Sequence, residues 1–341
     1  MSYHDIYKEV FCLKKFENML KDIGYTECSK CQKYSSAGNA FYIDNEEITG
    51  IYWFYETEYF IIDIHDFFIK KEMIVDSFPT IKPYMSFSST YIITANGEWF
   101  NPYQNMTSNT VFIMNVDNSD IRFLLHGNHP YFSVGVNFKK NMIEKYLDTT
   151  NDDISNIFLD TRDLITKHIN KLANSILNCK MTSTSASLFF EAKAKEWLSI
   201  TLNAYEQKKY VKPISEKDEK AIENVANYID DHLTFDIPQE LLEKIAMMSG
   251  TKLKNTFKHK YQMSITEYTQ RKRINIAENL ILTTNLDIKD IAKSVGYNSH
   301  SRFTTLFKRY KNIYPKDLKG SNDQYIQSIC CKNKNNNKIK P

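Results

Sequence analysis

Two short stretches near the end of the 341-residue chain carry polar and basic side chains at helical spacing. Leu253 and Phe257 are spaced i, i+4 in the first stretch, and so are Phe303 and Phe307 in the second. Apolar residues at this spacing form the buried stripe of a helix, so the residues between them face outward. The outward residues are Thr251, Lys252, Lys254, Asn255 and Lys258 in the first stretch, and His300, Ser301, Arg302, Thr305, Lys308 and Arg309 in the second.

These outward side chains are of the types that bind nucleic acids, and we expect two kinds of contact from them. A Lys or Arg on a phosphate contributes affinity without sequence information, whereas a side chain at a base edge discriminates between bases. We expect phosphate contacts from Lys252, Lys258, Lys308 and Arg309, base contacts from Thr251, Lys254, Asn255, His300, Ser301 and Thr305, and either contact from Arg302.

A shorter apolar helix and a turn come before each of these stretches. Ahead of the second stretch, apolar residues recur at the i, i+3, i+4, i+7 spacing of one helix face, from Ile288 to Val295. Asp287 is placed to cap the start of that helix and Gly296 to end it. Two short helices joined by a turn, with the second helix exposed, are typical of a helix-turn-helix motif that places its second helix in the major groove.

The same pattern occurs twice, and the corresponding residues Phe257 and Phe307 lie 50 positions apart. Between the two copies, the capping box from Ser264 to Glu267 predicts the start of a linker helix. Two recognition helices held apart by such a linker could enter successive major grooves, about 34 Å apart, on one face of the duplex. The sequence therefore predicts an all-α DNA-binding domain over 215–320.

Three segments in the last third of the chain resemble the DNA-binding domain of the AraC/XylS family of bacterial transcription regulators. They are MSGTKLKNTFKHKY from Met248, YTQRKRINIAENLI from Tyr268 and IKDIAKSVGYNSHSRFTTLFKRY from Ile288, and Leu242, Ala246 and Pro315 also match. Glu243 departs from the family, which has a small residue there, and Met247, Gln262 and Asn312 stand where the family has glycine. The resemblance implies binding to double-stranded DNA, contact with RNA polymerase and a sensor domain ahead of the DNA-binding half.

Charge is unevenly distributed along the chain, although the formal net charge is only +3. Residues 244–319 hold 16 Lys or Arg against 5 Asp or Glu, whereas residues 1–212 hold 22 against 26. A basic block beside a slightly acidic one is typical of a nucleic-acid-binding half joined to a half that avoids phosphates. The length is sufficient for two domains, each with its own core.

Residues 41–140 are rich in aromatic and β-branched residues without a helical period, which predicts a series of short strands. Asn96-Gly97, Asn101-Pro102 and Gly127-Asn128 are the predicted turns between them. Such strands favour a sandwich or barrel, and a cupin-like jelly roll fits both the pattern and the family resemblance. The predicted fold class is α+β, with a cupin-like β-barrel sensor domain over 1–140, N-terminal extension included, and trailing helices ahead of the all-α domain.

Residues 141–207 have helical periodicity and predict a helical connector after the barrel. The resemblance implies that these helices mediate a homodimer, and the alternative is that they only cap the barrel. Gln207 to Pro213 is predicted to be a linker because proline stops a helix. Residues 321–341 are polar and lack periodicity, which predicts a disordered tail.

The aromatic side chains between residues 50 and 140 could line a pocket for a small-molecule effector, or they could simply fill the barrel. His65, His126 and His129 lack the spacing of a complete cupin metal motif, so we predict no metal site and no cofactor. No nucleophile with a base and no paired carboxylates are recognisable in the sequence. A glycine-rich phosphate loop is not recognisable either, and the whole chain has only 9 glycines. No catalytic residue and no enzymatic activity are therefore predicted.

The cysteines are few, six in the whole chain. Cys28 and Cys31 have the spacing of half a zinc site, but no second pair follows, and ordinary thiols are the simpler interpretation. Residues 1–20 lack the apolar segment of a secretory signal, and no apolar run approaches the roughly 20 residues of a membrane span. We therefore expect a soluble, cytoplasmic protein without a membrane partner.

These patterns predict a sequence-specific DNA-binding transcription regulator, controlled at its N-terminal domain by a small-molecule effector or a protein partner. One alternative is a regulator without a small-molecule effector. Another is an enzyme, either a metal-dependent cupin fused to the DNA-binding domain or a chain that uses Cys330 and Cys331 as acceptor thiols. A third is a protein that coats DNA of any sequence. The patterns do not distinguish an activator from a repressor, and they identify neither operator nor effector.

Overall fold

The structure is a computed structural model that describes residues 16–28, 33–76, 81–82, 84–100, 103–116, 122–147, 151–210, 214–311 and 313–319. The chain divides into an amino-terminal unit, which reaches Tyr205, and a carboxy-terminal unit that begins at Glu206. Strands and helices both occur in the first unit, and the described part of the second unit is helical. The predicted tail over 321–341 lies outside the described residues.

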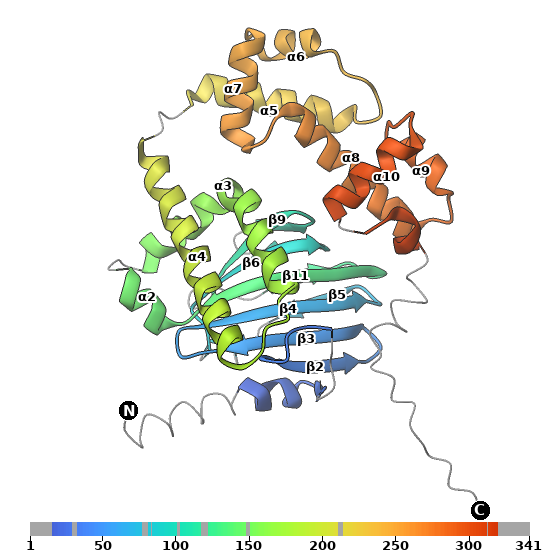
Figure 1. Ribbon diagram of the computed structural model, residues 1–341. Coiled ribbons are helices and arrows are strands. Elements are labelled where there is room, and N and C mark those ends of the chain that lie inside the picture. Colours follow the sequence, from blue (N-terminus) through green and yellow to red (C-terminus); the bar gives the residue numbers. More distant parts are fainter. Residues whose placement is uncertain are drawn as a thin grey trace, which may run out of the picture. The chain divides into compact units, whose positions relative to one another are not determined.

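Two antiparallel sheets form the centre of the amino-terminal unit (Figure 1). The larger has the strand order β1-β2-β3-β4-β11-β6-β9, and the smaller has the order β5-β10-β7-β8. The strands are β1 Thr26–Glu27, β2 Asn39–Asp44, β3 Ile48–Glu56, β4 Phe60–Ile69, β5 Met73–Asp76, β6 Phe87–Thr94, β7 Asn96–Phe100, β8 Tyr103–Thr107, β9 Thr110–Asn115, β10 Arg122–Leu125 and β11 His129–Phe138. The prediction of a cupin-like jelly roll stays a prediction.

Both faces of the larger sheet are covered, and this explains why its strands lack a clear alternation of polar and apolar residues. On β4, Ile62 and Ile64 belong to a core shared with the helices, whereas Ile61 and Phe67 belong to a second core shared with the smaller sheet. Successive side chains of a strand point to opposite faces, so both sets must be apolar.

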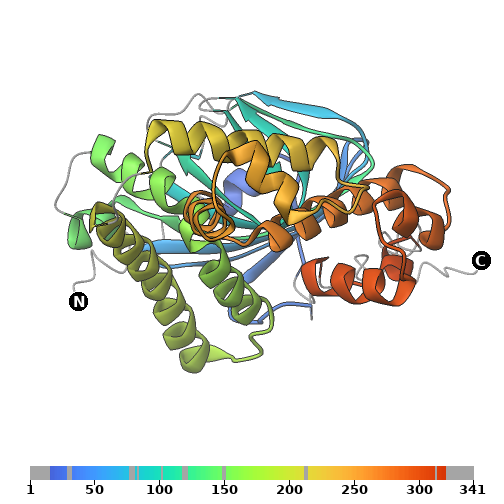
Figure 2. The same cartoon turned by 90° about the horizontal axis from the view of Figure 1, so that it is seen from above.

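Helices α3 (Asn151–Leu177) and α4 (Ser183–Tyr210) cover one face of the larger sheet, and the short α2 (Lys140–Tyr146) precedes them (Figures 1 and 2). Trp197 of α4 is fully buried, and its Nε1 donates to Ser89 Oγ on β6 at 2.9 Å. The helices therefore cap the sheet, as one of the two interpretations of this region expected. Their predicted role in a homodimer stays a prediction.

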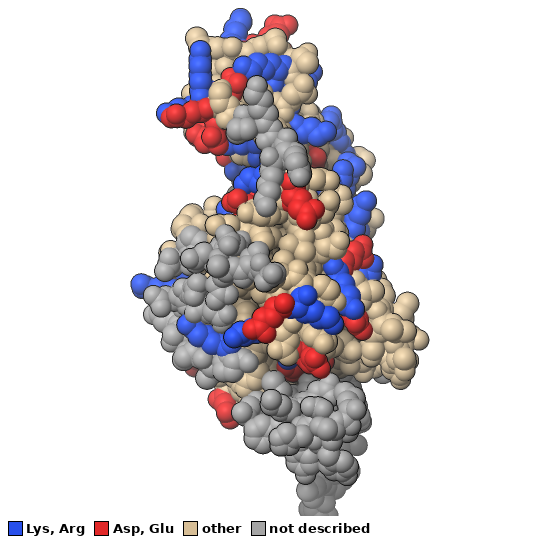
Figure 3. Space-filling view, turned by 90° about the vertical axis from the view of Figure 1, so that its left-hand side faces the viewer, with Lys and Arg blue, Asp and Glu red and all other residues tan. Residues whose placement is uncertain are grey.

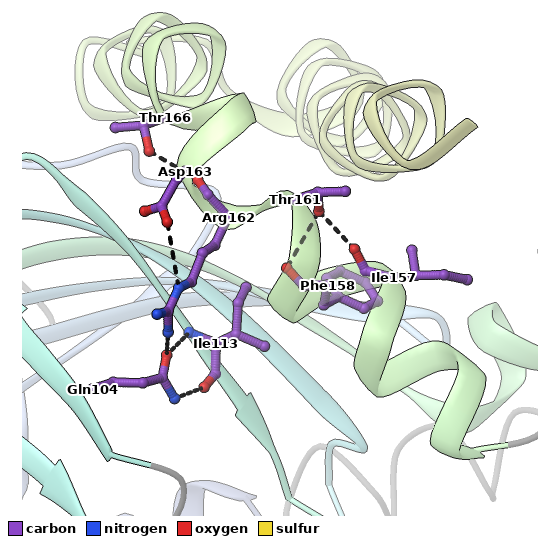
Figure 4. Close-up of polar contacts among 8 residues, drawn as sticks. All are labelled: Gln104, Ile113, Ile157, Phe158, Thr161, Arg162, Asp163 and Thr166. Atoms are coloured by element: carbon purple, nitrogen blue, oxygen red, sulfur yellow. Dashed lines mark hydrogen bonds and ion pairs between the residues drawn. The ribbon is translucent and has the colours of Figure 1, made fainter. Parts of the chain in front are cut away.

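A polar contact ties α3 to both sheets (Figure 4). Arg162 Nη1 on α3 donates to Gln104 Oε1 at 2.8 Å, and Gln104 Nε2 donates to the Ile113 carbonyl at 2.8 Å. Gln104 lies on β8 of the smaller sheet and Ile113 on β9 of the larger. The Gln104 amide therefore joins the two sheets, and the guanidinium joins them to the helix.

Two predictions about connections were wrong. Asn96 and Gly97 lie inside β7 instead of forming a turn, and a Cβ on Gly97 would lie 2.4 Å from the Leu124 carbonyl oxygen of β10. Glycine is needed there for the close approach of a neighbouring strand, a second use of glycine that sequence alone does not separate from a turn. The predicted linker begins too early, because α4 continues to Tyr210.

Of the other two predicted turns, one is present in the structure and one lies outside the described residues. Gly127 and Asn128 do separate β10 from β11, and Asn128 has a φ of 56°. Asn101 and Pro102 lie outside the described residues, between β7 and β8.

The carboxy-terminal unit contains two small cores joined by one helix. Its helices are α5 Glu216–Asp231, α6 Gln239–Ala246, α7 Gly250–Tyr261, α8 Ile265–Thr283, α9 Ile288–Ser294 and α10 His300–Lys311, followed by a helical turn at residues 315–319. The first core is formed by α5, α6 and α7, and the second by α9 and α10. Tyr268 of α8 packs in the first core, and Ile274 and Ala277 of α8 pack in the second.

Within the described residues, no helix combines the length and the apolar character that a membrane span requires.

Candidate nucleic-acid interface

Each pair α6–α7 and α9–α10 forms two short helices joined by a turn. The turns contain a residue in the left-handed region, Met247 with a φ of 51° in the first pair and Gly296 with a φ of 84° in the second. Serine caps the second helix of each pair. Ser249 Oγ accepts from the Lys252 amide at 3.5 Å, and Ser299 Oγ accepts from the Arg302 amide at 3.3 Å.

The predicted cap at Asp287 differs from the expectation. Asp287 is the N-cap residue of α9, but its carboxylate makes no capping hydrogen bond. It lies 3.8 Å from Lys319 Nζ instead. The Asp287 side chain is 86% exposed, so water can solvate its carboxylate in place of the helix amides.

The apolar stripes of α7 and α10 are buried as their spacing predicted. Leu253, Phe257, Phe303 and Phe307 are all fully buried, and they hold the two helices on their cores. The polar faces of the helices are consequently turned to solvent. Exposed on them are Thr251, Lys252, Lys254, Asn255 and Lys258 of α7 and His300, Ser301, Arg302, Thr305 and Arg309 of α10, while Lys308 is half-buried.

Some of these side chains have protein partners. Lys308 Nζ lies 5.0 Å from the centre of the Tyr314 ring, and Thr305 Oγ1 donates to the Ser301 carbonyl at 3.0 Å. Thr305 can still accept a hydrogen bond from a base, since its donated bond uses only its proton. Asn255 is exposed on α7, and its side-chain amide has a donor NH₂ group and an acceptor oxygen with which it could contact a base edge.

Carboxylates of α5 lie beside the basic residues of α7. Lys252 Nζ is 2.8 Å from Asp218 Oδ1, and Lys260 Nζ is 2.8 Å from Glu219 Oε1 and 2.6 Å from Glu223 Oε1. Hydrogen bonding to the lysines lowers the pKa of Asp218 and that of Glu219 below their ordinary values. Figure 3 shows red carboxylates interspersed among blue cations on one face of this unit.

These acidic partners were missed by the sequence reasoning. Asp218 lies 34 residues before Lys252, so no local spacing connects the two. The only available signal was the acidic first turn of α5, which holds Glu216, Asp218 and Glu219.

Helix α8 is attached to both motifs by polar contacts as well as by its two cores. Toward the first motif, Lys272 Nζ lies 2.7 Å from Asp230 Oδ2 of α5. Toward the second, Lys311 Nζ of α10 lies 2.5 Å from Glu278 Oε2 of α8, and both side chains are at least 95% buried. Burial lowers the pKa of Lys311, while Glu278 acts in the opposite direction.

The three histidines once considered for a metal site do not converge. His65 is half-buried and its Nδ1 lies 3.2 Å from Ser133 Oγ, whereas His129 Nδ1 lies 2.9 Å from the Pro130 carbonyl. His126 lies between Glu72 and Glu98, and although burial acts against protonation, hydrogen bonds to these carboxylates raise its pKa. Among the described residues, no three His, Cys, Asp or Glu side chains are placed to hold a metal ion together.

The cysteines add no constellation to the described part of the chain. Cys28 is half-buried and Cys179 is buried, and neither forms a disulfide. Cys31, Cys330 and Cys331 lie outside the described residues.

A family model described as a helix-turn-helix domain matches residues 242–321. The bifunctional transcriptional activator/DNA repair enzyme AdaA of Bacillus subtilis is 34% identical over 103 residues, covering 30% of this chain and 49% of that protein. The arabinose operon regulatory protein of Escherichia coli is 23% identical over 114 residues, covering 33% of this chain and 38% of that protein. The chain thus spans about half the length, or less, of these curated relatives, which are named mainly as transcriptional regulators.

Among solved structures, the chain is similar to the C-terminal domain of the two-component response regulator yesN from Fusobacterium nucleatum. The sequence identity is 31% and the TM-score 0.28, and the match covers 29% of this chain and 98% of that structure.

Proposed function

We propose that this chain, which belongs to the AraC family of transcriptional regulators, binds specific double-stranded DNA with α7 and α10 in successive major grooves. The observation that carries the proposal is the orientation of the two helices. Each buries a phenylalanine, Phe257 or Phe307, and exposes a polar and basic face. The helix α8 between them is 19 residues, or about 28 Å, long, which suits the separation of neighbouring grooves.

Base reading and phosphate binding are assigned to different residues. We assign base contacts to Thr251, Lys254, Asn255, His300, Ser301 and Thr305, and phosphate contacts to Lys252, Lys258, Lys308 and Arg309, with Arg302 able to make either. A non-specific DNA-coating protein would need only the cations. The exposed amide and hydroxyl groups among them favour a sequence-specific protein.

Gel shifts on a selected site and on a scrambled one test this assignment. Sites are first selected from a random duplex library with the full chain. Asn255→Ala and Thr305→Ala should each change the preference at one base position, with a loss of about 1–3 kcal/mol on the selected site and little loss on the scrambled one. Lys308→Ala should weaken both sites alike and reduce the salt slope by about one phosphate contact.

Lys289 provides a matched control for the charge of Lys308. It is exposed on α9, outside the proposed interface, so Lys289→Ala removes the same charge without removing a phosphate contact. Equal losses on both sites for Asn255→Ala, Thr305→Ala and Lys308→Ala would refute the division of roles.

We further propose that a small molecule bound in the amino-terminal unit controls DNA binding, with control by a protein partner as the alternative. The supporting observation is a buried carboxylate on β4. Asp63 is only 3% exposed, and its Oδ2 accepts from Tyr52 Oη at 3.1 Å and from Asn137 Nδ2 at 2.7 Å. Its Oδ1 has no hydrogen-bond partner in the part of the chain that the structure describes. A ligand that donates a hydrogen bond to this oxygen would remove the cost of burying it unpaired.

Thermal unfolding in the presence of a metabolite panel tests ligand control. Trp53, Trp99 and Trp197 all lie in the amino-terminal unit, so tryptophan fluorescence reports its melting. A ligand should raise the melting temperature of the wild type, and Asp63→Asn should abolish the rise. Asp66→Asn, which changes a buried carboxylate already bonded to Lys33 and Tyr34, should keep it. No response to any compound would favour a protein partner.

Two further partners, a second copy of the protein and RNA polymerase, stay predictions.

A further inference from the structure

Arg273 lies on α8 at the junction between the two helix-turn-helix motifs. Tyr268, which packs in the first core, lies five residues before it, and Ile274 and Ala277, which pack in the second core, follow it. The apolar contacts of α8 therefore change from one motif to the other at this position. Because each core is small and separate, packing alone leaves the angle between the motifs dependent on α8.

The guanidinium of Arg273 donates hydrogen bonds to both motifs. On the first side, Nε donates to the Leu233 carbonyl at 2.6 Å and Nη2 donates to the Phe235 carbonyl at 2.7 Å. These carbonyls belong to the segment between α5 and α6. On the second side, Nη1 donates to the carbonyl of Gly296, in the turn between α9 and α10, at 3.1 Å. One side chain thus links the loop of the first motif to the turn of the second.

The second motif approaches this contact closely. A Cβ on Gly296 would lie 2.9 Å from the Thr234 carbonyl oxygen and 3.0 Å from Arg273 Cζ. The next residue, Tyr297, has its ring centre 5.6 Å from Arg273 Cζ, which adds a cation–π contact. Glycine at position 296 therefore serves the left-handed turn and also the close contact between the motifs.

A cleft of about 440 Å³ lies beside Arg273, and residues of both motifs line it. Phe235 and Ile237 line it from the first motif, and Tyr297 and Arg302 line it from the second. Beside this cleft, the hydrogen bonds of Arg273 are a direct polar contact between the two halves.

We propose that Arg273 is a positioning residue that fixes the distance and angle between α7 and α10, and thereby the spacing of the two DNA half-sites that the chain accepts. The inference rests on the proposed function, since spacing matters only if both helices bind DNA. A guanidinium suits this task because its planar fork directs several donors at fixed angles, whereas a lysine offers one compact charge. Two linked modules bind tightly only while both can engage together, so the rigidity of the link decides how strictly spacing is read.

The test compares DNA duplexes that differ only in the separation of the half-sites. The full chain first selects its site from a random library, and duplexes are then made with one base pair inserted or removed between the half-sites. One base pair moves a half-site by about 3.4 Å and rotates it by about 34°. The wild type should lose about 100-fold in affinity on the altered spacings. Arg273→Ala should bind the original site more weakly but lose only about tenfold, or less, when the spacing changes.

A merely structural role would give a different result, because a partly unfolded domain loses affinity on every spacing by the same factor. Arg273→Lys keeps the alkyl stem and the charge, so it preserves folding while losing the three-way contact, and it should also relax the spacing requirement. Arg271→Ala is the matched control. Arg271 bonds to Glu267 of its own helix and stacks on Tyr310, so its loss should leave spacing discrimination unchanged.

An unchanged ratio between matched and altered spacings in Arg273→Lys would overturn the proposal. A wild-type chain that selects no sequence at all would overturn the proposed function, and the inference with it. A wild type that selects a bipartite site, together with an Arg273→Lys variant as strict as the wild type, would leave the DNA-binding function intact and refute only the positioning role.

Discussion

In the first helix-turn-helix motif, lysines of α7 face carboxylates of α5 at the protein surface, whereas in the second, Lys311 of α10 meets Glu278 of α8 in the interior. The Lys252–Asp218 pair is open to solvent, with 52% of the lysine side chain exposed. The Lys311–Glu278 pair is almost fully buried, with side-chain exposures of 1% and 5%. The same type of ion pair therefore has two functions, tuning surface charge in one motif and fixing a helix in the other.

The turns of the two motifs also differ, because a left-handed backbone conformation is adopted by glycine in one and by methionine in the other. Gly296 adopts its left-handed conformation without steric cost, whereas Met247 adopts a similar conformation with its side chain 88% exposed. Gln262, which ends α7, is a second non-glycine residue in this region, with a φ of 54°. The first motif thus carries backbone strain that the second avoids at the corresponding turn. We infer that the second motif is the more firmly held of the two.

Breaking the buried Lys311–Glu278 pair should cause the largest loss of stability that distinguishes the two motifs. Lys311→Met removes the cation beside the buried Glu278 carboxylate and should destabilise the carboxy-terminal unit by about 3–5 kcal/mol. Unfolding followed by far-UV circular dichroism measures this loss, while fluorescence of Trp53, Trp99 and Trp197 reports the amino-terminal unit as an internal reference. The double change Lys311→Met with Glu278→Leu should recover most of the stability, since an apolar pair replaces the ionic one.

The matched change in the first motif is Lys260→Met. Lys260 is 17% exposed, but its partners Glu219 and Glu223 are each 51% exposed and remain solvated after its loss, so the destabilisation should be far smaller than for Lys311→Met. If Lys260→Met and Lys311→Met destabilised the unit equally, the two motifs would be held in the same way and the comparison would fail.

The buried faces of the two motifs could be predicted from sequence because their determinants are local. Leu253 and Phe257 lie one helical turn apart, so their spacing alone places them on one face, and the same holds for Phe303 and Phe307. The caps at Ser249, Ser264 and Ser299 lie next to the helices they begin, and all three accept the expected backbone hydrogen bond.

Contacts between distant segments could not be predicted. The carbonyls that Arg273 binds lie up to 40 residues away, and a backbone carbonyl leaves no residue type to recognise. Gly97 was wrongly assigned to a turn because the same residue also permits the close approach of β10. The extent of α4 was misjudged because Pro213 restricts the helix only near its own position, and the helix continues to Tyr210.

The smallest expected effect concerns the surface pair of the first motif. In the free protein Lys252 faces Asp218, so binding a phosphate requires the lysine to exchange or share its partner. Asp218→Asn removes the competing charge and should raise affinity for every duplex by about two- to threefold, with a slightly steeper salt slope. Gel shifts on the selected and scrambled sites at several salt concentrations measure both changes.

Glu216→Gln controls for the change in net charge, because Glu216 lies in the same first turn of α5 but pairs with Lys220 of its own helix. If Asp218 acts through Lys252, the Asp218→Asn gain should disappear in a Lys252→Ala background, whereas a general effect of net charge would persist there and would be matched by Glu216→Gln. A gain of equal size in both single variants would mean that the carboxylates of α5 set only the overall field around the first motif. A gain confined to Asp218→Asn would place the restraint on Lys252, one lysine of the recognition helix.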